Sequence, residues 1–173
     1  MAKIDATTSA ADDAAAGSLE RLYSAPGHLI RRCQQIAVAI FVDEMREFDL
    51  TPVQYAALFV VRAQPGVDQT RLVNLIALDR STIGSVVERL ETKGLITRKA
   101  GTEDRRTKRL YPTEAGIALL AAVTDAVDRA QHRILAPLNA AERAAFMTML
   151  TRLVDINNAH SRAPLRPVGE PSR

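Results

Sequence analysis

Apolar residues recur at helical spacing between residues 79 and 94. The stripe consists of Ile83, Val86, Val87 and Leu90, at positions i, i+3, i+4 and i+7, as in a helix that packs one face on a core. The Asp79 carboxylate can accept the unpaired N–H groups of a first turn, and Gly94 is suited to the left-handed position that ends a helix. The pattern therefore predicts a helix bounded by these two residues.

The opposite face of this predicted helix is polar and carries mostly short side chains. Gly84 leaves the surface uncovered, and the side chains around it are short hydroxyls followed by a guanidinium one turn further. They are Ser81, Thr82, Ser85 and Arg89. Hydrogen-bonding groups of this size suit base edges and phosphates of nucleic acid.

The periodicity changes after Gly94. Residues 95–99 and 107–112 have the composition of two strands, and residues 101–106 that of a turn, which predicts a β-hairpin. From Lys93 to Arg109 there are seven basic and two acidic residues, a charge of +5, whereas the whole chain carries +3. A solvated charged surface is the ordinary explanation of a basic stretch. A positive hairpin beside a polar helix face, however, is what neutralisation of DNA phosphates requires.

Two shorter helices are predicted before this segment. Thr51, Pro52 and Gln54 form a capping-box pattern with proline at the first helical position, which predicts a helix from residue 52 to about residue 64. Asp68 can cap a short helix that ends near Ile76. Two residues then lead to the helix after Asp79, the spacing of a helix-turn-helix motif.

The flanking regions predict more apolar surface than one DNA-reading lobe can cover. A helix is expected from about residue 25 to 48, and its segment 36–42 is apolar on all sides, which predicts burial. A long helix is expected from Thr113 to Pro137, followed by another that opens with a capping box at Asn139 and Glu142. We expect a second copy of the chain to cover these surfaces; the alternative is a monomeric helical subdomain.

Composition supports a mainly α fold. Apolar residues make up 47% of the 173 residues and aromatic residues 4%, so the core is expected to be aliphatic. The predicted fold class is a winged helix-turn-helix with a small β-hairpin wing, joined to a helical dimerisation region. The expected divisions are a flexible tail (1–18), a first dimerisation helix region (19–50), the DNA-binding lobe (51–112), C-terminal dimerisation helices (113–160) and a second flexible tail (161–173).

The sequence predicts neither a metal site nor a cofactor. A single cysteine excludes an internal disulfide, and the three histidines are far apart in sequence. No signal-peptide core or long apolar run is present, so a cytoplasmic protein is expected. The sequence pI of about 9.3 is compatible with a nucleic-acid partner.

Three stretches resemble the MarR family of winged-helix regulators: LTPVQYAAL at 50–58, LDRSTIGSVVERLETKGLITR at 78–98 and DRRTKRLYPTEAG at 104–116. In the last, Asp104 and Arg106 match the family's Asp-x-Arg, and Thr113 and Gly116 match its Leu-Thr-x-x-Gly. The departure is Tyr111-Pro112 before Thr113. The resemblance implies a homodimer that binds a pseudopalindromic operator in double-stranded DNA.

We therefore predict a sequence-specific repressor. The helix would enter the major groove through Ser81, Thr82, Ser85 and Arg89. Arg106, helped by Arg105, would reach the flanking minor groove, with Asp104 either orienting an arginine or acting only as a turn former. The predicted phosphate contacts are Arg98, Lys99 and Lys108.

The resemblance also implies a small anionic or aromatic effector. The candidate polar residues are His28, Arg31, Arg32 and Gln35, with Phe41 and Tyr55 as apolar walls. His28 could instead be a cap or surface residue, and the two arginines could form surface pairs. The block at 26–45 is similar to the subgroup that controls degradation of aromatic acids such as hydroxycinnamates, whose effectors include acyl-CoA thioesters. Two adjacent arginines suit the phosphates of CoA, whereas a carboxylate requires one.

Other hypotheses about the function remain open. Cys33 could make the protein a redox-sensing repressor, although its neighbours Arg32 and Gln34 and an expected deeper position argue against this. A sequence-neutral architectural DNA-binding protein could use the same wing. An enzyme is the least supported reading, because no nucleophile and base pair, phosphate loop or metal-ligand spacing is visible.

Overall fold

The computed structural model describes residues 19–101 and 107–166. They fall into two units, one ending at Ala39 and the other beginning at Ile40, and each is described by itself. The first contains helical residues 19–23 and the greater part of α2 (Pro26–Glu44). The predicted N-terminal tail, residues 1–18, lies outside the described residues, as do residues 167–173.

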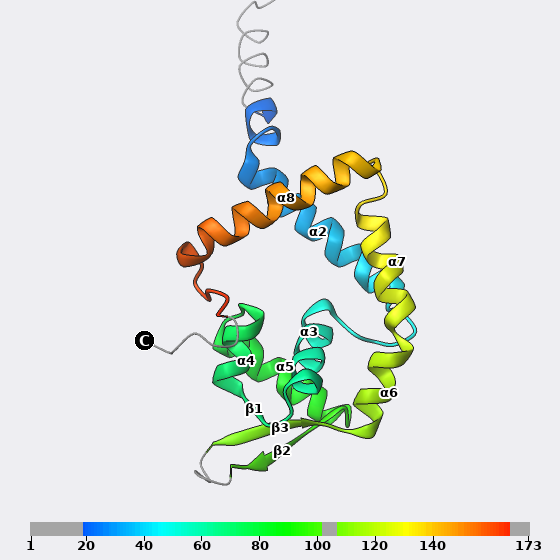
Figure 1. Cartoon of the computed structure of the whole chain (residues 1–173), viewed down its shortest axis with the longest axis vertical. Helices are drawn as coiled ribbons and strands as arrows, with labels where there is room; N and C mark the ends of the chain where they lie inside the picture. Colours follow the sequence, from blue (N-terminus) through cyan, green and yellow to red (C-terminus); the bar gives the residue numbers. More distant parts are fainter. Residues whose placement is uncertain (1–18, 102–106, 167–173) are drawn as a thin grey trace, which may run out of the picture. The chain divides into compact units, whose positions relative to one another are not determined.

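The second unit is mainly helical with a small antiparallel sheet (Figure 1). The predicted fold class is confirmed. After the end of α2, its elements are α3 (Pro52–Ala63), β1 (Val67–Asp68), α4 (Gln69–Ile76), α5 (Arg80–Thr92), β2 (Ile96–Ala100), β3 (Lys108–Pro112), α6 (Glu114–Ala122), α7 (Thr124–Ile134), α8 (Ala140–Asn157) and the 3₁₀ turn η1 (Asn158–His160).

Helix boundaries follow the predicted caps. Thr51 and Gln54 form a complete capping box before α3, and Asn139 and Glu142 form another before α8. The Asp68 and Asp79 carboxylates cap α4 and α5. Each cap satisfies backbone N–H groups that have no partner within the helix, which is why local sequence sufficed to predict these ends.

The wing hairpin is present, with one more strand than predicted. β2 and β3 are antiparallel, and Leu110 of β3 faces Arg98 of β2 on one side and Val67 of β1 on the other. β1 was not predicted because a two-residue strand has no periodicity of its own; it pairs with residues of β3 that are more than forty positions away in sequence.

An aliphatic core joins α3, α4, α5 and the sheet, which Figure 1 shows grouped together. The predicted stripe of α5 is buried in this core, with Ile83, Val87 and Leu90 fully inaccessible to solvent. The opposite face of α5 is thereby turned to solvent.

The long helix predicted from Thr113 to Pro137 is instead two helices, α6 and α7, which meet at Val123 and end at Ile134. Neither glycine nor proline lies at the break. The Thr124 hydroxyl donates a hydrogen bond to the carbonyl oxygen of Leu120, 3.2 Å away. A threonine that bonds to the carbonyl four residues earlier commonly bends a helix, which accounts for the break.

Apolar side chains remain exposed on α2 and α8. The predicted burial of segment 36–42 is wrong for the isolated chain, because Ile36, Val38 and Val42 are exposed and, in α2, only Phe41 is buried. α8 has no buried residue at all. These helices were predicted to be covered by a second copy, and the single chain leaves them bare.

The predicted C-terminal tail begins with a segment that is held in place. The Asn158 side chain makes two hydrogen bonds with the backbone of Leu165, and the Arg166 N–H donates to the Asn74 carbonyl oxygen of α4 at 2.9 Å. Residues 161–166 are therefore not free, which corrects the expectation of a flexible tail from residue 161. The prolines that suggested a tail do prevent a helix but not these contacts. No helix of the described ranges is long and apolar enough to span a bilayer.

Candidate nucleic-acid interface

The solvent face of α5 presents the polar side chains that the sequence analysis selected. Ser81, Ser85 and Arg89 are exposed and Thr82 is half-buried. Because the opposite stripe is anchored in the core, this face cannot rotate inward without exposing Ile83 and Leu90. The roles of these residues in binding DNA stay predictions.

Asp79 organises the start of this face. Its carboxylate accepts hydrogen bonds from Ser81 Oγ at 2.6 Å, Thr82 Oγ1 at 2.6 Å and the Thr82 backbone N–H at 2.8 Å. The hydroxyl bonds of Ser81 and Thr82, followed by the Thr82 backbone bond, hold the pKa of the Asp79 carboxyl far below its usual range. The carboxyl is therefore ionised at neutral pH, and both hydroxyls are already hydrogen-bonded before any partner binds.

Arg80 is a basic residue beside the start of this face, and it was not predicted. It is exposed at the first position of α5, and its Nη2 lies 3.3 Å from Thr70 Oγ1 on α4. A guanidinium at the junction of two helices of a helix-turn-helix is well situated for a phosphate. The sequence does show that Arg80 follows the helix cap Asp79, but this position was used only to predict the cap.

The described part of the wing holds basic residues in unlike environments. Arg98 pairs with Glu91 of α5 at 3.3 Å, and Lys99 Nζ lies 5.0 Å from the centre of the Tyr111 ring. Lys108 is exposed. Arg98 thus serves in part to join β2 to α5, a pairing that a count of charges could not reveal.

Two further cations counted in the basic segment are held by acidic partners. Arg109 lies 3.6 Å from the Asp68 carboxylate and donates to the Gly66 carbonyl oxygen. Lys93 pairs with the Asp49 carboxylate at 2.8 Å. The predicted minor-groove residues Asp104, Arg105 and Arg106 lie outside the described residues.

Comparison with known proteins decides the family. The model of the MarR family matches residues 50–108. The HTH-type transcriptional repressor NicR of Pseudomonas putida is 33% identical over 129 residues, which cover 75% of this chain and 82% of that protein. The chain belongs to the MarR family. A putative transcriptional regulatory protein for the hcr operon of Thauera aromatica is 37% identical over 128 residues, 73% of this chain and 77% of that protein.

A solved structure agrees with this assignment. It is the structure of BpsR from Bordetella bronchiseptica, a protein whose DNA binding is regulated by 6-hydroxynicotinic acid. BpsR is 30% identical to this chain, the match covers 77% of this chain and 95% of that one, and the TM-score is 0.72. MarR proteins are transcriptional regulators. The prediction of a DNA-binding transcriptional repressor of this family is confirmed at that level.

The predicted effector residues are divided between the two units. In the first, the His28 ring lies 5.6 Å from that of Tyr23, and its Nε2 is buried without a hydrogen-bond partner among the described residues. Arg31 and Arg32 are both exposed, and Arg31 donates to the Gln35 side chain at 2.8 Å. Cys33 is also exposed, which corrects the expectation that it lies deeper.

In the second unit the predicted aromatic walls form part of a row. The centres of the Phe41 and Tyr55 rings are 5.9 Å apart, and those of Tyr55 and Phe59 are also 5.9 Å apart. Phe59 is 52% exposed and was not predicted, because it stands within the apolar run 58–61, which does not indicate which side chain faces outward. Such an exposed ring beside a half-buried tyrosine can stack on a planar ligand.

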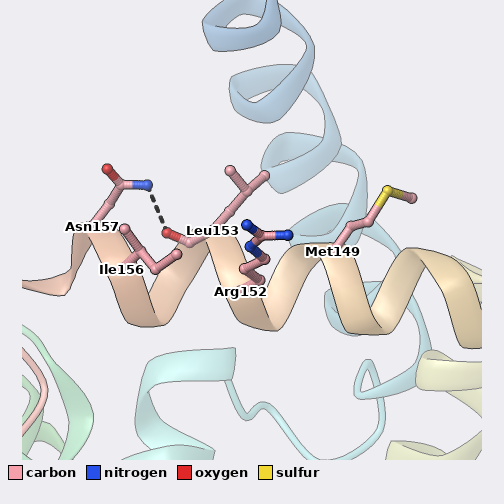
Figure 2. Close-up of a pocket in the computed structure, with 5 residues that line it drawn as sticks. All are labelled: Met149, Arg152, Leu153, Ile156 and Asn157. Carbon is pink, nitrogen blue, oxygen red and sulfur yellow. Dashed lines mark hydrogen bonds between the residues drawn. The ribbon is translucent and has the colours of Figure 1, made fainter.

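The exposed face of α8 contains a hollow of about 410 Å³. Figure 2 shows its five lining residues, Met149, Arg152, Leu153, Ile156 and Asn157, all on this one helix. Leu153 and Ile156 are 53% and 67% exposed. A hollow lined by one helix only is an unpaired apolar surface rather than an enclosed ligand site. Within the described ranges, no three His, Cys, Asp or Glu side chains gather as a metal site.

Proposed function

We propose that the chain is a homodimeric repressor that binds a pseudopalindromic operator and is released by a small aromatic acid or its CoA thioester. The observation that carries this proposal is the polar solvent face of α5, fixed by a fully buried opposite stripe and followed by a basic hairpin. Such a helix fits the major groove, where base edges are distinguishable, and the hairpin is suited to the flanking phosphates.

The exposed apolar faces of α2 and α8 support the homodimer. On α8, four of the exposed side chains are Met149, Leu153, Val154 and Ile156. A contiguous apolar surface of this kind is typical of a protein interface. Two-fold symmetry also sets two α5 helices about 34 Å apart, one turn of DNA, which a pseudopalindrome requires.

An aromatic acid is supported by chemistry on both units. The row of Phe41, Tyr55 and Phe59 offers stacking surface, and Arg32 is a guanidinium without an ion pair among the described residues. BpsR is regulated by 6-hydroxynicotinic acid, a planar aromatic acid. An effector of this class acts by binding more tightly to the form of the dimer in which the spacing of the two DNA-binding lobes does not match the operator. A hundredfold preference would shift the equilibrium by about 2.7 kcal/mol.

The test is fluorescence anisotropy with labelled DNA from upstream of the protein's own gene. Protein is titrated at about 150 mM salt against this duplex and against a random duplex, because non-specific binding dominates at low salt. Free aromatic acids and their CoA thioesters are then added in parallel to the preformed complex. We expect specific binding, release by one of the two classes, and loss of that release in Arg32→Ala or Phe59→Ala with operator affinity retained.

The outcomes separate the rival readings. Release by the thioester alone would assign both Arg31 and Arg32 to CoA phosphates, and release by the free acid alone would point to one arginine. Equal competition by random DNA would establish the architectural reading instead. Release by peroxide that is abolished in Cys33→Ser would establish the redox reading, for which the exposure of the Cys33 thiol is the supporting observation.

A further inference from the structure

The hydroxyl groups at the start of α5 can each donate only one hydrogen bond. Ser81 Oγ and Thr82 Oγ1 each lie 2.6 Å from a different oxygen of the Asp79 carboxylate. An ionised carboxylate has no proton to give, so both hydroxyls must point their single proton toward Asp79. What each oxygen can still offer another partner is a lone pair.

This arrangement fixes which atoms of a base the two hydroxyls can bind. A free hydroxyl rotates and serves as donor or acceptor, which is why serine and threonine are usually poor at telling bases apart. With their protons committed, Ser81 and Thr82 are acceptors toward solvent. In the major groove the donors are the amino groups of adenine and cytosine, whereas guanine and thymine present acceptors at the corresponding edge.

We propose that Asp79 is a positioning residue for operator specificity: by accepting the protons of Ser81 and Thr82, it makes the start of α5 select adenine or cytosine and disfavour guanine or thymine. This inference rests on the proposed function, since it assumes that α5 reads the major groove. Asp79 itself would contact no base and would act through the two hydroxyls.

Asp79→Asn gives a test with a directional outcome. The amide oxygen can keep the two bonds now made to Oδ1, from the Thr82 N–H and Ser81 Oγ. The amide nitrogen then replaces Oδ2 and donates to Thr82 Oγ1, which frees the Thr82 proton for the groove. The variant therefore keeps its cap and its serine contact but turns Thr82 from an acceptor into a donor.

The measurement is selection of bound duplexes from a randomised half-site library, with full-length wild-type and variant protein, followed by sequencing. At one position of each half-site, we expect the preference to change from adenine or cytosine to guanine or thymine, by on the order of five- to tenfold, while the other positions stay unchanged. The double variant Asp79→Asn/Thr82→Val, which has no hydroxyl there, should lose the preference at that position in either direction.

A second experiment measures the affinity of wild-type protein for modified operators, so its main result does not depend on the folding of a variant. In the selected operator, each adenine is replaced in turn by purine, which lacks the 6-amino group, and each cytosine by pyrimidin-2-one, which lacks the 4-amino group. We expect a loss of several-fold at one or two positions and no such loss in Thr82→Val or Ser81→Ala. Unchanged affinity at every replaced base, or the same selected motif for wild type and Asp79→Asn, would overturn the inference. Failure of the wild type to select any motif would instead overturn the proposed function.

Discussion

Gly116 allows α6 to pack closely against the segment that follows α5. An added Cβ at this position would lie 2.1 Å from the carbonyl oxygen of Leu95. That contact is so close because Thr113, the cap of α6, donates through its hydroxyl to the Gly94 carbonyl oxygen and through its N–H to Leu95. The start of α6 is thereby pressed against the chain that leaves α5.

We expect Gly116→Ala to lower the free energy of unfolding by at least about 2 kcal/mol, because backbone must move to admit the methyl group. Thermal unfolding followed by circular dichroism measures this loss. Gly27→Ala is the matched control, since nothing lies within 4 Å of its added Cβ; in α2 it should be neutral or slightly stabilising. Equal melting temperatures for Gly116→Ala and wild type would contradict the close packing.

Residues whose role depends on near neighbours were predictable, and residues whose role depends on distant ones were not. Asp79 and Gly94 follow from capping chemistry within one turn, and both were predicted. The pairing of Arg98 with Glu91 and the bond from Arg80 to Thr70 depend on how β2 and α4 pack against α5. The basic charge of the segment was visible in the sequence, but its division between phosphate contacts and internal pairs was not.

At the scale of elements, an ion-pair network joins the end of α2 to α7 within the second unit. Arg133 lies 2.8 Å from Asp43 and 2.6 Å from Glu44, and Arg129 lies 2.9 Å from Glu44. Hydrogen bonds from Arg133 are the main cause of the lowered pKa values of both carboxyls. Nothing in the sequence indicated this network, because its members are more than eighty residues apart.

The lowered pKa values give this network a pH dependence of known sign. Both carboxyls have folded pKa values below their ordinary values of 3.8 and 4.5, so their contribution to stability is complete above about pH 5 and is lost as pH falls through the folded pKa values. We expect Arg133→Gln to melt at a lower temperature than wild type at pH 7, and the difference to shrink as pH is lowered below 4. The change is expected to be small, since Arg133 and Asp43 are largely exposed to solvent, although the Glu44 side chain is mostly covered.

Arg62→Gln is the matched control for this series. Arg62 is exposed on α3 and has no ion pair among the described residues. Arg62→Gln should therefore melt at the same temperature as wild type at each pH from 3 to 7. A difference between Arg133→Gln and wild type that stays constant over this range would mean that Arg133 stabilises α7 by packing rather than through the carboxylates.

The prediction of the elements succeeded where a cap or a period was present. The capping boxes of α3 and α8 and the period of α5 gave those helices their ends and faces. The break between α6 and α7 was not predicted, because a threonine within a run of helically spaced apolar residues is as compatible with a straight helix as with a bend. β1 escaped because it exists only through its pairing with β3.

At the scale of the whole molecule, the unpaired faces of α2 and α8 require an explanation that one chain does not supply. In the second half of α8, Thr148, Thr151 and Asp155 recur at helical spacing on one side, and Met149, Leu150, Leu153, Val154 and Ile156 recur on the other. A helix without any buried residue gains little from tertiary packing, which is where most helical stability in proteins arises. A second chain would supply that packing and would also pair the two DNA-reading lobes.

We therefore expect Leu153→Glu to convert the protein from a dimer to a monomer, because it would bury a carboxylate in an apolar interface. Light scattering coupled to size exclusion measures the mass, and operator binding should weaken on the order of a hundredfold, since two linked half-sites bind with an avidity that one lobe lacks. Thr151→Glu adds the same charge on the polar face of the same helix and should remain dimeric and fully active. If Leu153→Glu kept the dimer mass and wild-type affinity, α8 would not be the dimer surface, and α2 alone would have to hold the two lobes at the spacing of one DNA turn.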